Sequence, residues 1–154
     1  MIVQIVLFPE TPVAVIEHRG DPATETDTVR KLVAWKLKNG LTNPQNNRHY
    51  GLHYGDPKNT AADQHRVEFC LSVDGDIAQN SDGITARTLP ARRCALARDI
   101  GSRHNNQAIV HLMQSWLPSS GESLGALPVI FHYVNVGPNV RPADMITDVY
   151  LPLA

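Results

Sequence analysis

Cysteine is scarce in this 154-residue chain, and its two cysteines, Cys70 and Cys94, have no metal-ligand spacing. A reducing cytoplasm is the compartment that such cysteine usage predicts. No apolar run approaches the roughly 20 residues of a membrane helix. Residues 1–8 also lack the charged start and the cleavage site of a signal peptide. We therefore expect a cytoplasmic protein with no membrane partner.

Charge of one sign is also lacking, since the formal net charge is −1. Proteins that bind nucleic acid usually carry a basic patch, and the pair Arg92-Arg93 is too short to form one. His49 and His53 are four residues apart, but no third ligand supports a metal site, so we interpret them as ordinary polar side chains. The chain has neither a phosphate-binding loop nor a G-x-S-x-G motif. We predict no cofactor, no metal and no direct nucleic-acid partner.

The most informative stretch is residues 8–40, because residues 89–121 repeat it without a gap at an offset of 81 (90 − 9 and 116 − 35). The chain has only two tryptophans, and they fall in the same register. The identical pairs are Pro9 with Pro90, Ala14 with Ala95, Gly20 with Gly101, Val29 with Val110, Trp35 with Trp116 and Gly40 with Gly121. The match continues with Tyr50 on Phe131. Near the end the offset becomes 80, where residues 66–73 lie on residues 146–153. This repetition indicates an internal duplication, with halves at 2–73 and 84–153.

Hydrophobic periodicity predicts the same elements in both halves. In the first half we expect strands at 2–7, 13–18, 49–54 and 66–73, and a helix at 26–39. In the second half we expect strands at 84–89, 92–100, 129–135 and 146–153. A helix at 105–117 should end at Pro118 and Gly121. At 154 residues and 42% hydrophobic composition, this is one globular domain. The predicted fold class is α+β, with two pseudo-symmetric β-β-α-β-β halves around a central ligand cleft.

Side-chain spacing also predicts which residues face the core. In the first helix, the apolar residues that recur at helical spacing and should form the buried face are Val29, Leu32, Val33 and Leu37. Trp35 lies about 60° beyond Leu32 on the helical wheel, so we place its ring at the edge of the core. Trp116 stands in the same relation to Met113. The strand at 66–73 alternates apolar and polar residues, which predicts a half-buried strand with Glu68 on its polar face.

In this order, the motifs of the chain resemble the GyrI-like family, the effector-binding domain of AraC- and MerR-type regulators. The matching segments are 13–20 (VAVIEHRG), 51–57 (GLHYGDP), 66–73 (RVEFCLSV), 116–121 (WLPSSG) and 148–153 (DVYLPL), together with Trp35. The resemblance covers nearly the whole chain. It implies a duplicated strand-helix-strand-strand fold that binds a small aromatic or lipophilic cationic molecule between its halves. The domain begins at Met1, so we expect a stand-alone protein.

The resemblance also implies an acid that faces the ligand, and here the chain departs from the pattern. Many members carry a Glu two residues before a Tyr in the strand before the last, whereas this chain has Phe131 two residues before Tyr133. The acid of the final strand is retained as Asp148. Some stand-alone members hydrolyse cyclopropane-bearing genotoxins, and loss of the first Glu weighs against such catalysis here.

Glu68 and Asp148 occupy equivalent positions in the two halves and are the candidate charged ligand contacts. The alternative interpretation is two exposed strand carboxylates, with Glu68 paired to an arginine. Aromatic faces suit flat or cationic ligands, although some of these rings will be core. The predicted ligand-binding residues are Trp35, Tyr50, Tyr54, Glu68, Trp116, Phe131, Tyr133, Asp148 and Tyr150.

The function that we predict is stand-alone binding of an amphipathic aromatic or cationic small molecule. Two alternatives remain open at this point. One is a hydrolase of a reactive electrophile in which Asp148 or Glu68 positions water and a Tyr hydroxyl assists, although we assign no catalytic residue. The other is an interaction protein with a partner such as a regulator or gyrase. Cys70 and Cys94 have no adjacent base in sequence, so we interpret them as small buried side chains.

Overall fold

The computed structural model describes residues 1–54, 66–126 and 128–154. Its chain forms two compact units. The N-terminal unit is Thr11–Leu89, and the C-terminal unit is Pro90–Ala154 together with Met1–Glu10. The predicted turn at residues 55–57 and the polar loop at 58–65 lie outside the described residues.

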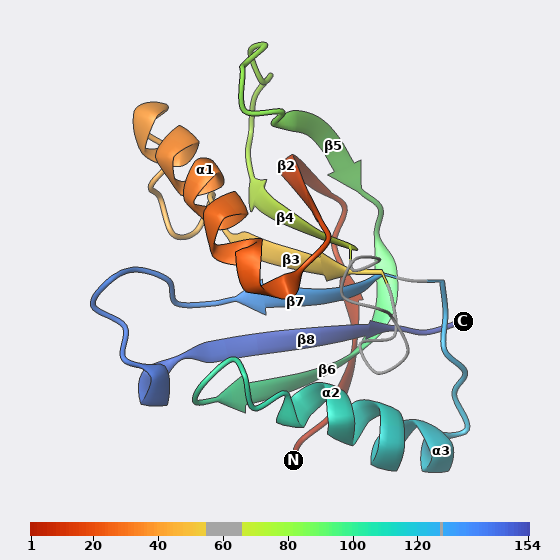
Figure 1. Ribbon diagram of the computed structural model, residues 1–154. Coiled ribbons are helices and arrows are strands. Elements are labelled where there is room, and N and C mark those ends of the chain that lie inside the picture. Colours follow the sequence, from red (N-terminus) through yellow and green to blue (C-terminus); the bar gives the residue numbers. More distant parts are fainter. Residues whose placement is uncertain (55–65, 127) are drawn as a thin grey trace. The chain divides into compact units, whose positions relative to one another are not determined.

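The described residues of the N-terminal unit form an antiparallel sheet and a helix (Figure 1). Its strands are β2 (Thr11–Arg19), β3 (His49–His53), β4 (Arg66–Ser72) and β5 (Thr85–Leu89). Strand β4 pairs with β2 and β3, and β2 also pairs with β5. The helix α1 (Glu25–Lys38) follows β2 after the short turn η1 (Pro22–Thr24), which Asp21 caps by accepting the Ala23 amide at 2.9 Å.

The C-terminal unit also has four described strands and a helical segment, but its edge strand β1 comes first in the chain, whereas β5 comes last in the N-terminal unit. Its strands are β1 (Gln4–Phe8), β6 (Arg92–Ile100), β7 (Val129–Tyr133) and β8 (Ile146–Pro152). Strand β6 pairs with β1 and β8, and β8 also pairs with β7, all antiparallel. The helical segment between β6 and β7 comprises α2 (Gln107–His111), the π-helical turn η3 (Leu112–Trp116) and α3 (Leu117–Ser120), and the turn η4 (Pro142–Asp144) precedes β8.

The first strand of each sequence repeat pairs inside the other unit. Strand β1 precedes β2 in the chain but pairs with β6, and β5 precedes β6 but pairs with β2. Prolines at positions 9 and 90 follow β1 and β5, so neither strand continues directly into the next. The sequence repeats at 2–73 and 84–153 therefore do not contain the same strands as the compact units.

The strand bounds locate the one-residue slip between the repeats. Strands β1 and β2 match β5 and β6 at an offset of 81 (85 − 4 and 92 − 11). Strands β3 and β4 match β7 and β8 at an offset of 80 (129 − 49 and 146 − 66). Tyr50 is thus equivalent to Ile130, and its predicted match to Phe131 was wrong. A shift of one residue reverses the face of every side chain in a strand, so Tyr50 and Phe131 lie on opposite faces of their sheets.

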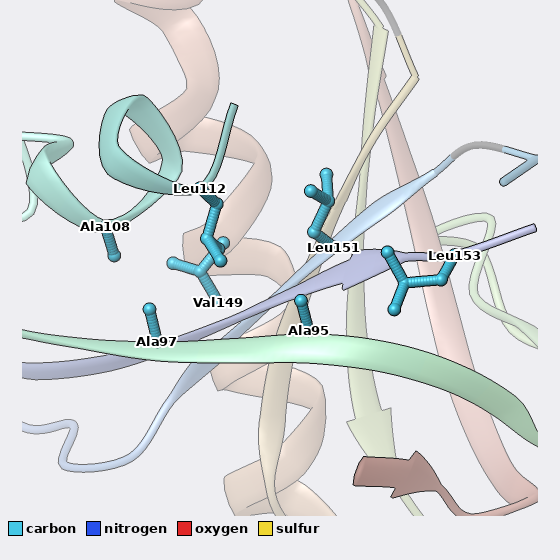
Figure 2. Packing of buried hydrophobic residues seen from close by; sticks show 7 residues of the cluster. All are labelled: Ala95, Ala97, Ala108, Leu112, Val149, Leu151 and Leu153. Carbon is cyan, nitrogen blue, oxygen red and sulfur yellow. The ribbon is translucent and has the colours of Figure 1, made fainter. Parts of the chain in front are cut away.

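Apolar side chains from the helical segment and two strands form the core of the C-terminal unit. Figure 2 shows Ala108 and Leu112 of the helical segment beside Val149 of β8. Small residues on β6 allow the helical segment to pack closely against the sheet. The fully packed members are Ala95, Ala97, Ala108, Leu112, Val149, Leu151 and Leu153.

The buried face of α1 differs from the predicted one. Leu32 and Trp35 are buried at 1% and 9% exposure, whereas Val33 and Leu37 are exposed at 36% and 62%. Thr28 lies on the same buried stripe, because its hydroxyl bonds the His18 ring of β2 at 2.7 Å. The indole of Trp35 therefore belongs to the core and not to its edge.

Pro118 does not end the second helical segment as predicted. It lies near the start of α3, and the helix ends at Ser120, where Gly121 adopts a positive φ of 78°. A proline inside an α-helix removes one hydrogen bond and collides with the preceding turn. The wider π-helical turn η3 comes directly before α3, in the turn that the proline ring would otherwise crowd.

Strand β4 is buried on both faces, and not on one as predicted. Cys70 and Leu71 both have 0% exposure, although they point to opposite sides. Glu68 is accordingly a buried carboxylate with 3% exposure.

Candidate functional site

Strand pairing assigns Glu68 to the sheet face opposite α1. Alternate side chains of a strand point to opposite faces, and the ring of His18 bonds α1. Its neighbour Glu17 therefore points away from α1. Glu68 points the same way, because Glu17 and Glu68 are a register pair on β2 and β4.

Two arginines neutralise the buried Glu68 carboxylate. The two terminal nitrogens of Arg87 donate to its oxygens Oε2 and Oε1 at 2.6 and 2.8 Å. Arg66 lies 3.7 Å from Oε1 and also donates to Glu17 at 3.2 Å. The bidentate contact of Arg87 with Glu68 is the strongest form of carboxylate recognition by arginine.

Tyr54 completes the polar group around Glu68. Its hydroxyl accepts a hydrogen bond from Arg87 at 3.3 Å, and the Arg66 guanidinium lies 4.2 Å from its ring centroid. Burial and the hydrogen bond to Glu68 raise the pKa of Tyr54. Burial acts to raise the pKa of Glu68 as well, but hydrogen bonds from Arg87 and Tyr54 and the charges of both arginines hold it below its ordinary value.

Asp148 occupies the equivalent position in the C-terminal unit. Asp99 faces the helical segment, because its Oδ1 accepts the Ala108 amide at 2.8 Å. The adjacent Arg98 and its register partner Asp148 therefore point to the opposite face. Arg98 donates Nε to Oδ1 at 2.7 Å and its terminal nitrogen to Oδ2 at 2.9 Å. The acid is buried at 7% exposure.

An aromatic pair lies on the same face as Asp148. Tyr150 is two residues further along β8, and its ring meets that of Phe8 edge to face with 5.1 Å between centroids. In the N-terminal unit, Tyr50 is buried on the face opposite α1, since it is a register partner of Cys70. Each predicted acid thus shares its sheet face with at least one tyrosine.

The remaining predicted aromatics lie on the helix-covered faces. Phe131 is the register partner of the core residue Val149, and it packs with Trp116 against the core of the C-terminal unit. Tyr133 lies on the same face, with the Arg103 guanidinium 5.2 Å from its ring centroid. Trp35 packs on the α1 side of the other unit. The predicted set is therefore divided between two kinds of face within the units.

Comparison with known proteins identifies the family. A model of the GyrI-like small molecule binding domain matches residues 1–154. The chain belongs to the GyrI-like family. Its α+β fold agrees with this assignment.

Two curated relatives indicate the general type of protein to which this chain is similar. The probable transcriptional regulator YgiV of Escherichia coli strain K12 is 34% identical over 153 residues, which cover 99% of this GyrI-like chain and 96% of YgiV. A DNA gyrase inhibitor of Erwinia billingiae is 25% identical over 127 residues, covering 80% of this chain and 78% of that protein.

Among solved structures, the GyrI-like chain is similar to EcmrR. The EcmrR chain in a DNA complex superposes with a TM-score of 0.79 at 20% identity, covering 98% of this chain and 56% of that one. The EcmrR C-terminal domain alone gives 0.77 at 18% identity, covering 99% and 96%. This chain thus spans little more than half of the longer EcmrR chain and has the fold of its C-terminal domain.

The alternative interpretation is confirmed in that Glu68 pairs with an arginine, and wrong in that both acids are buried. Sequence reasoning did not identify which arginines pair with the acids of this GyrI-like domain. Arg98 could have been found from the repeat, because it is equivalent to Glu17 (98 − 17 = 81). Each of these two residues lies on a strand that pairs antiparallel with the strand that carries the acid. Arg87 could not have been found, because it reaches Glu68 from β5, a strand that the sequence assigns to the other repeat.

The described residues offer neither a metal centre nor a reactive thiol. Within residues 1–54, 66–126 and 128–154, no group of three histidine, cysteine or acidic side chains is placed to hold a metal. Burial raises the pKa of Cys70 to about 12, and burial also raises the pKa of Cys94. No helix in this part of the GyrI-like chain has the length and apolarity to cross a membrane.

Proposed function

We propose that this GyrI-like domain binds a small amphipathic molecule with aromatic groups, including lipophilic cations, as an effector- or toxin-binding protein. The family assignment supports small-molecule binding as the general activity. The buried carboxylates support the narrower choice of ligand. Its two free, buried cysteines suit a reducing cytoplasm.

The observation that carries the proposal is the burial of two carboxylates at equivalent strand positions. Glu68 and Asp148 are 3% and 7% exposed. Burial of a charge is unfavourable unless a partner compensates it, so two buried carboxylates at equivalent positions are candidates for a functional role. A ligand cation can supply the same compensation that an arginine supplies in the free protein.

Aromatic residues beside the acids would supply the apolar contact. We assign the first contacts to Tyr54 beside Glu68 and to Tyr150 beside Asp148, with Tyr50 on the same sheet face as Glu68. Trp35, Trp116, Phe131 and Tyr133 lie on the helix-covered faces, where we assign them a supporting role. The predicted cleft between the halves stays a prediction.

The hydrolase alternative receives no support from the geometry around the acids. A general base needs a free carboxylate oxygen within about 3 Å of the water that it activates. Arg98 occupies both oxygens of Asp148, and Arg87 occupies both oxygens of Glu68.

A second candidate function is binding of a protein partner through β1. Ile5 and Leu7 of this strand point to one side and are 48% and 69% exposed, and Ile2 is 81% exposed. An uncharged strand with exposed apolar side chains suits contact with another chain. Leu7→Lys should abolish such a contact while it leaves small-molecule binding unchanged.

A thermal-shift screen of the purified protein tests the proposed function. The panel contains lipophilic aromatic cations, neutral aromatic compounds and cyclopropane-bearing electrophiles. Saturating binding to the folded state stabilises a protein by about 2.7 kcal/mol at a hundredfold excess over Kd. We expect a dose-dependent rise in Tm with aromatic compounds. Absence of any shift across the panel would contradict the proposal, and product formed from an electrophile would favour the hydrolase.

A further inference from the structure

We propose that Arg98 is an internal counter-ion that sets the charge preference for ligands at Asp148, an inference that rests on the proposed function. In the free protein, the guanidinium of Arg98 occupies both carboxylate oxygens of Asp148. A cationic ligand must exchange with Arg98 before it can reach the carboxylate. The chain should therefore discriminate against cations more strongly than its buried acid alone would suggest.

The contact geometry supports exchange at this pair. The side chain of Asp148 is 10% exposed, whereas that of Arg98 is 52% exposed. The guanidinium thus lies on the solvent side of the acid, and both carboxylate oxygens are taken by this one residue. Arginine has a long flexible side chain, so release of its two hydrogen bonds allows it to move into solvent without displacement of the strands.

The equivalent acid is held in a different way. Glu68 has two hydrogen bonds from Arg87, a second positive group in Arg66 at 3.7 Å, and the side chain of Tyr54. Its cross-strand partner is Glu17, at the position that Arg98 occupies in the other unit. Removal of Arg87 would therefore leave Glu68 partly compensated by Arg66 at 3.7 Å, whereas removal of Arg98 takes away both hydrogen bonds that its guanidinium donates to Asp148.

Charge arithmetic gives the direction of the effect. In the wild-type protein, the Arg98–Asp148 pair has no net charge, so a cation gains attraction only by displacing an equal charge. Without Arg98, the same carboxylate offers a whole negative charge in a partly enclosed site, where attraction is stronger than in water. Without the charge of Asp148, the guanidinium becomes a site for an anion.

Isothermal titration with tetraphenylphosphonium and tetraphenylborate tests the inference, because these ions share a shape and differ in charge. The measured quantity is the ratio of the two Kd values. We expect Arg98→Met to shift this ratio at least tenfold toward the cation, which corresponds to about 1.4 kcal/mol. Asp148→Asn should shift it toward the anion. Arg93→Met is the matched control, because Arg93 lies on the same strand but forms its ion pair with Glu122, at 2.7 Å, and not with Asp148.

The outcomes separate this inference from the proposed function. Wild-type binding with a ratio that neither variant changes would overturn the inference and leave the proposed function standing. No binding of either ion by any variant would overturn both for this ligand class. If circular dichroism shows that Arg98→Met does not fold, Arg98→Lys takes its place in the titrations and Asp148→Asn decides the question. An unchanged ratio of Kd values in Asp148→Asn overturns the inference, and a shift of the ratio toward the anion supports it.

Discussion

Glu17 and Glu68 lie directly opposite each other on β2 and β4, two carboxylates in one register pair. Like charges in this position are destabilising unless positive groups intervene. Arg66 lies between them, with contacts of 3.2 Å to Glu17 and 3.7 Å to Glu68, and Arg87 holds Glu68 from β5. The arrangement makes the stability of the N-terminal unit depend on arginines that are remote in sequence.

Loss of Arg87 should therefore destabilise the protein. Arg87→Met leaves a buried carboxylate with only Arg66 nearby, and we expect unfolding free energy to fall by about 2 kcal/mol in urea titrations. The double variant Arg87→Met/Glu68→Gln should recover part of this loss because no uncompensated charge remains. Arg19→Met, which removes an exposed pair with Glu17, should change stability by less than about 0.5 kcal/mol. Equal effects of the two arginine substitutions would contradict the buried-pair interpretation.

The acid limb of stability should depend on Glu68. Its pKa is lower in the folded protein than the ordinary value of 4.5 because of its arginine and tyrosine partners, although burial opposes them. A carboxyl with a lowered folded pKa stabilises the protein above its unfolded pKa, and this contribution disappears as pH falls through the folded value. We expect Tm to decline less steeply below about pH 4.5 in Glu68→Gln than in the wild type. Parallel Tm curves would exclude Glu68 as a contributor.

The buried face of α1 can be tested with two truncations. Trp35→Ala removes a side chain that is 9% exposed and should reduce unfolding free energy by about 3–5 kcal/mol. Leu37→Ala, at 62% exposure, should change it by less than about 0.5 kcal/mol. Chemical denaturation of both variants checks the orientation, and a larger loss for Leu37→Ala would reverse it.

Both thiols should be protected in the folded state. Cys70 and Cys94 are buried at 0% exposure, and burial raises the pKa of Cys70 to about 12. Because the thiolate is the reactive form, DTNB should label neither cysteine at pH 8 until the protein unfolds, and both in guanidinium chloride. Rapid labelling of one native thiol would show that its surroundings open locally.

Gly125 should resist substitution because of a close backbone approach. A Cβ at this position would lie 2.6 Å from the Leu153 carbonyl oxygen, where the Gly125 amide also bonds Pro152. Gly125→Ala should lower Tm by several degrees through displacement of the chain after β8. Gly75→Ala is the control, since nothing lies within 4 Å of its added Cβ. An unchanged Tm in Gly125→Ala would show that the C-terminal segment can move aside.

Local pattern was sufficient to predict every long element, and it failed where contacts came from elsewhere in the chain. Alternation and the 81-residue repeat placed β2 and β6 within two residues of their observed bounds. The face of α1 was predicted wrongly, because apolar residues at positions 33 and 37 are exposed while Thr28 and Lys36 bond the sheet. Glu68 and Asp148 were predicted as site residues from their equivalent positions on two strands. Their arginines were not, because the pairing of β5 with β2 brings Arg87 to Glu68 and is invisible to local periodicity.

The exchange of β1 and β5 also bears on how the gene could be divided. A fragment that ends after the first repeat would keep β1 without β6, its pairing partner, and would lose β5, which pairs with β2. The boundaries of the compact units therefore lie at residues 10 and 89, and not at the boundary between the repeated segments. A duplication that produced such a chain would have made each copy dependent on a strand of the other, so that neither could later be lost or recombined alone.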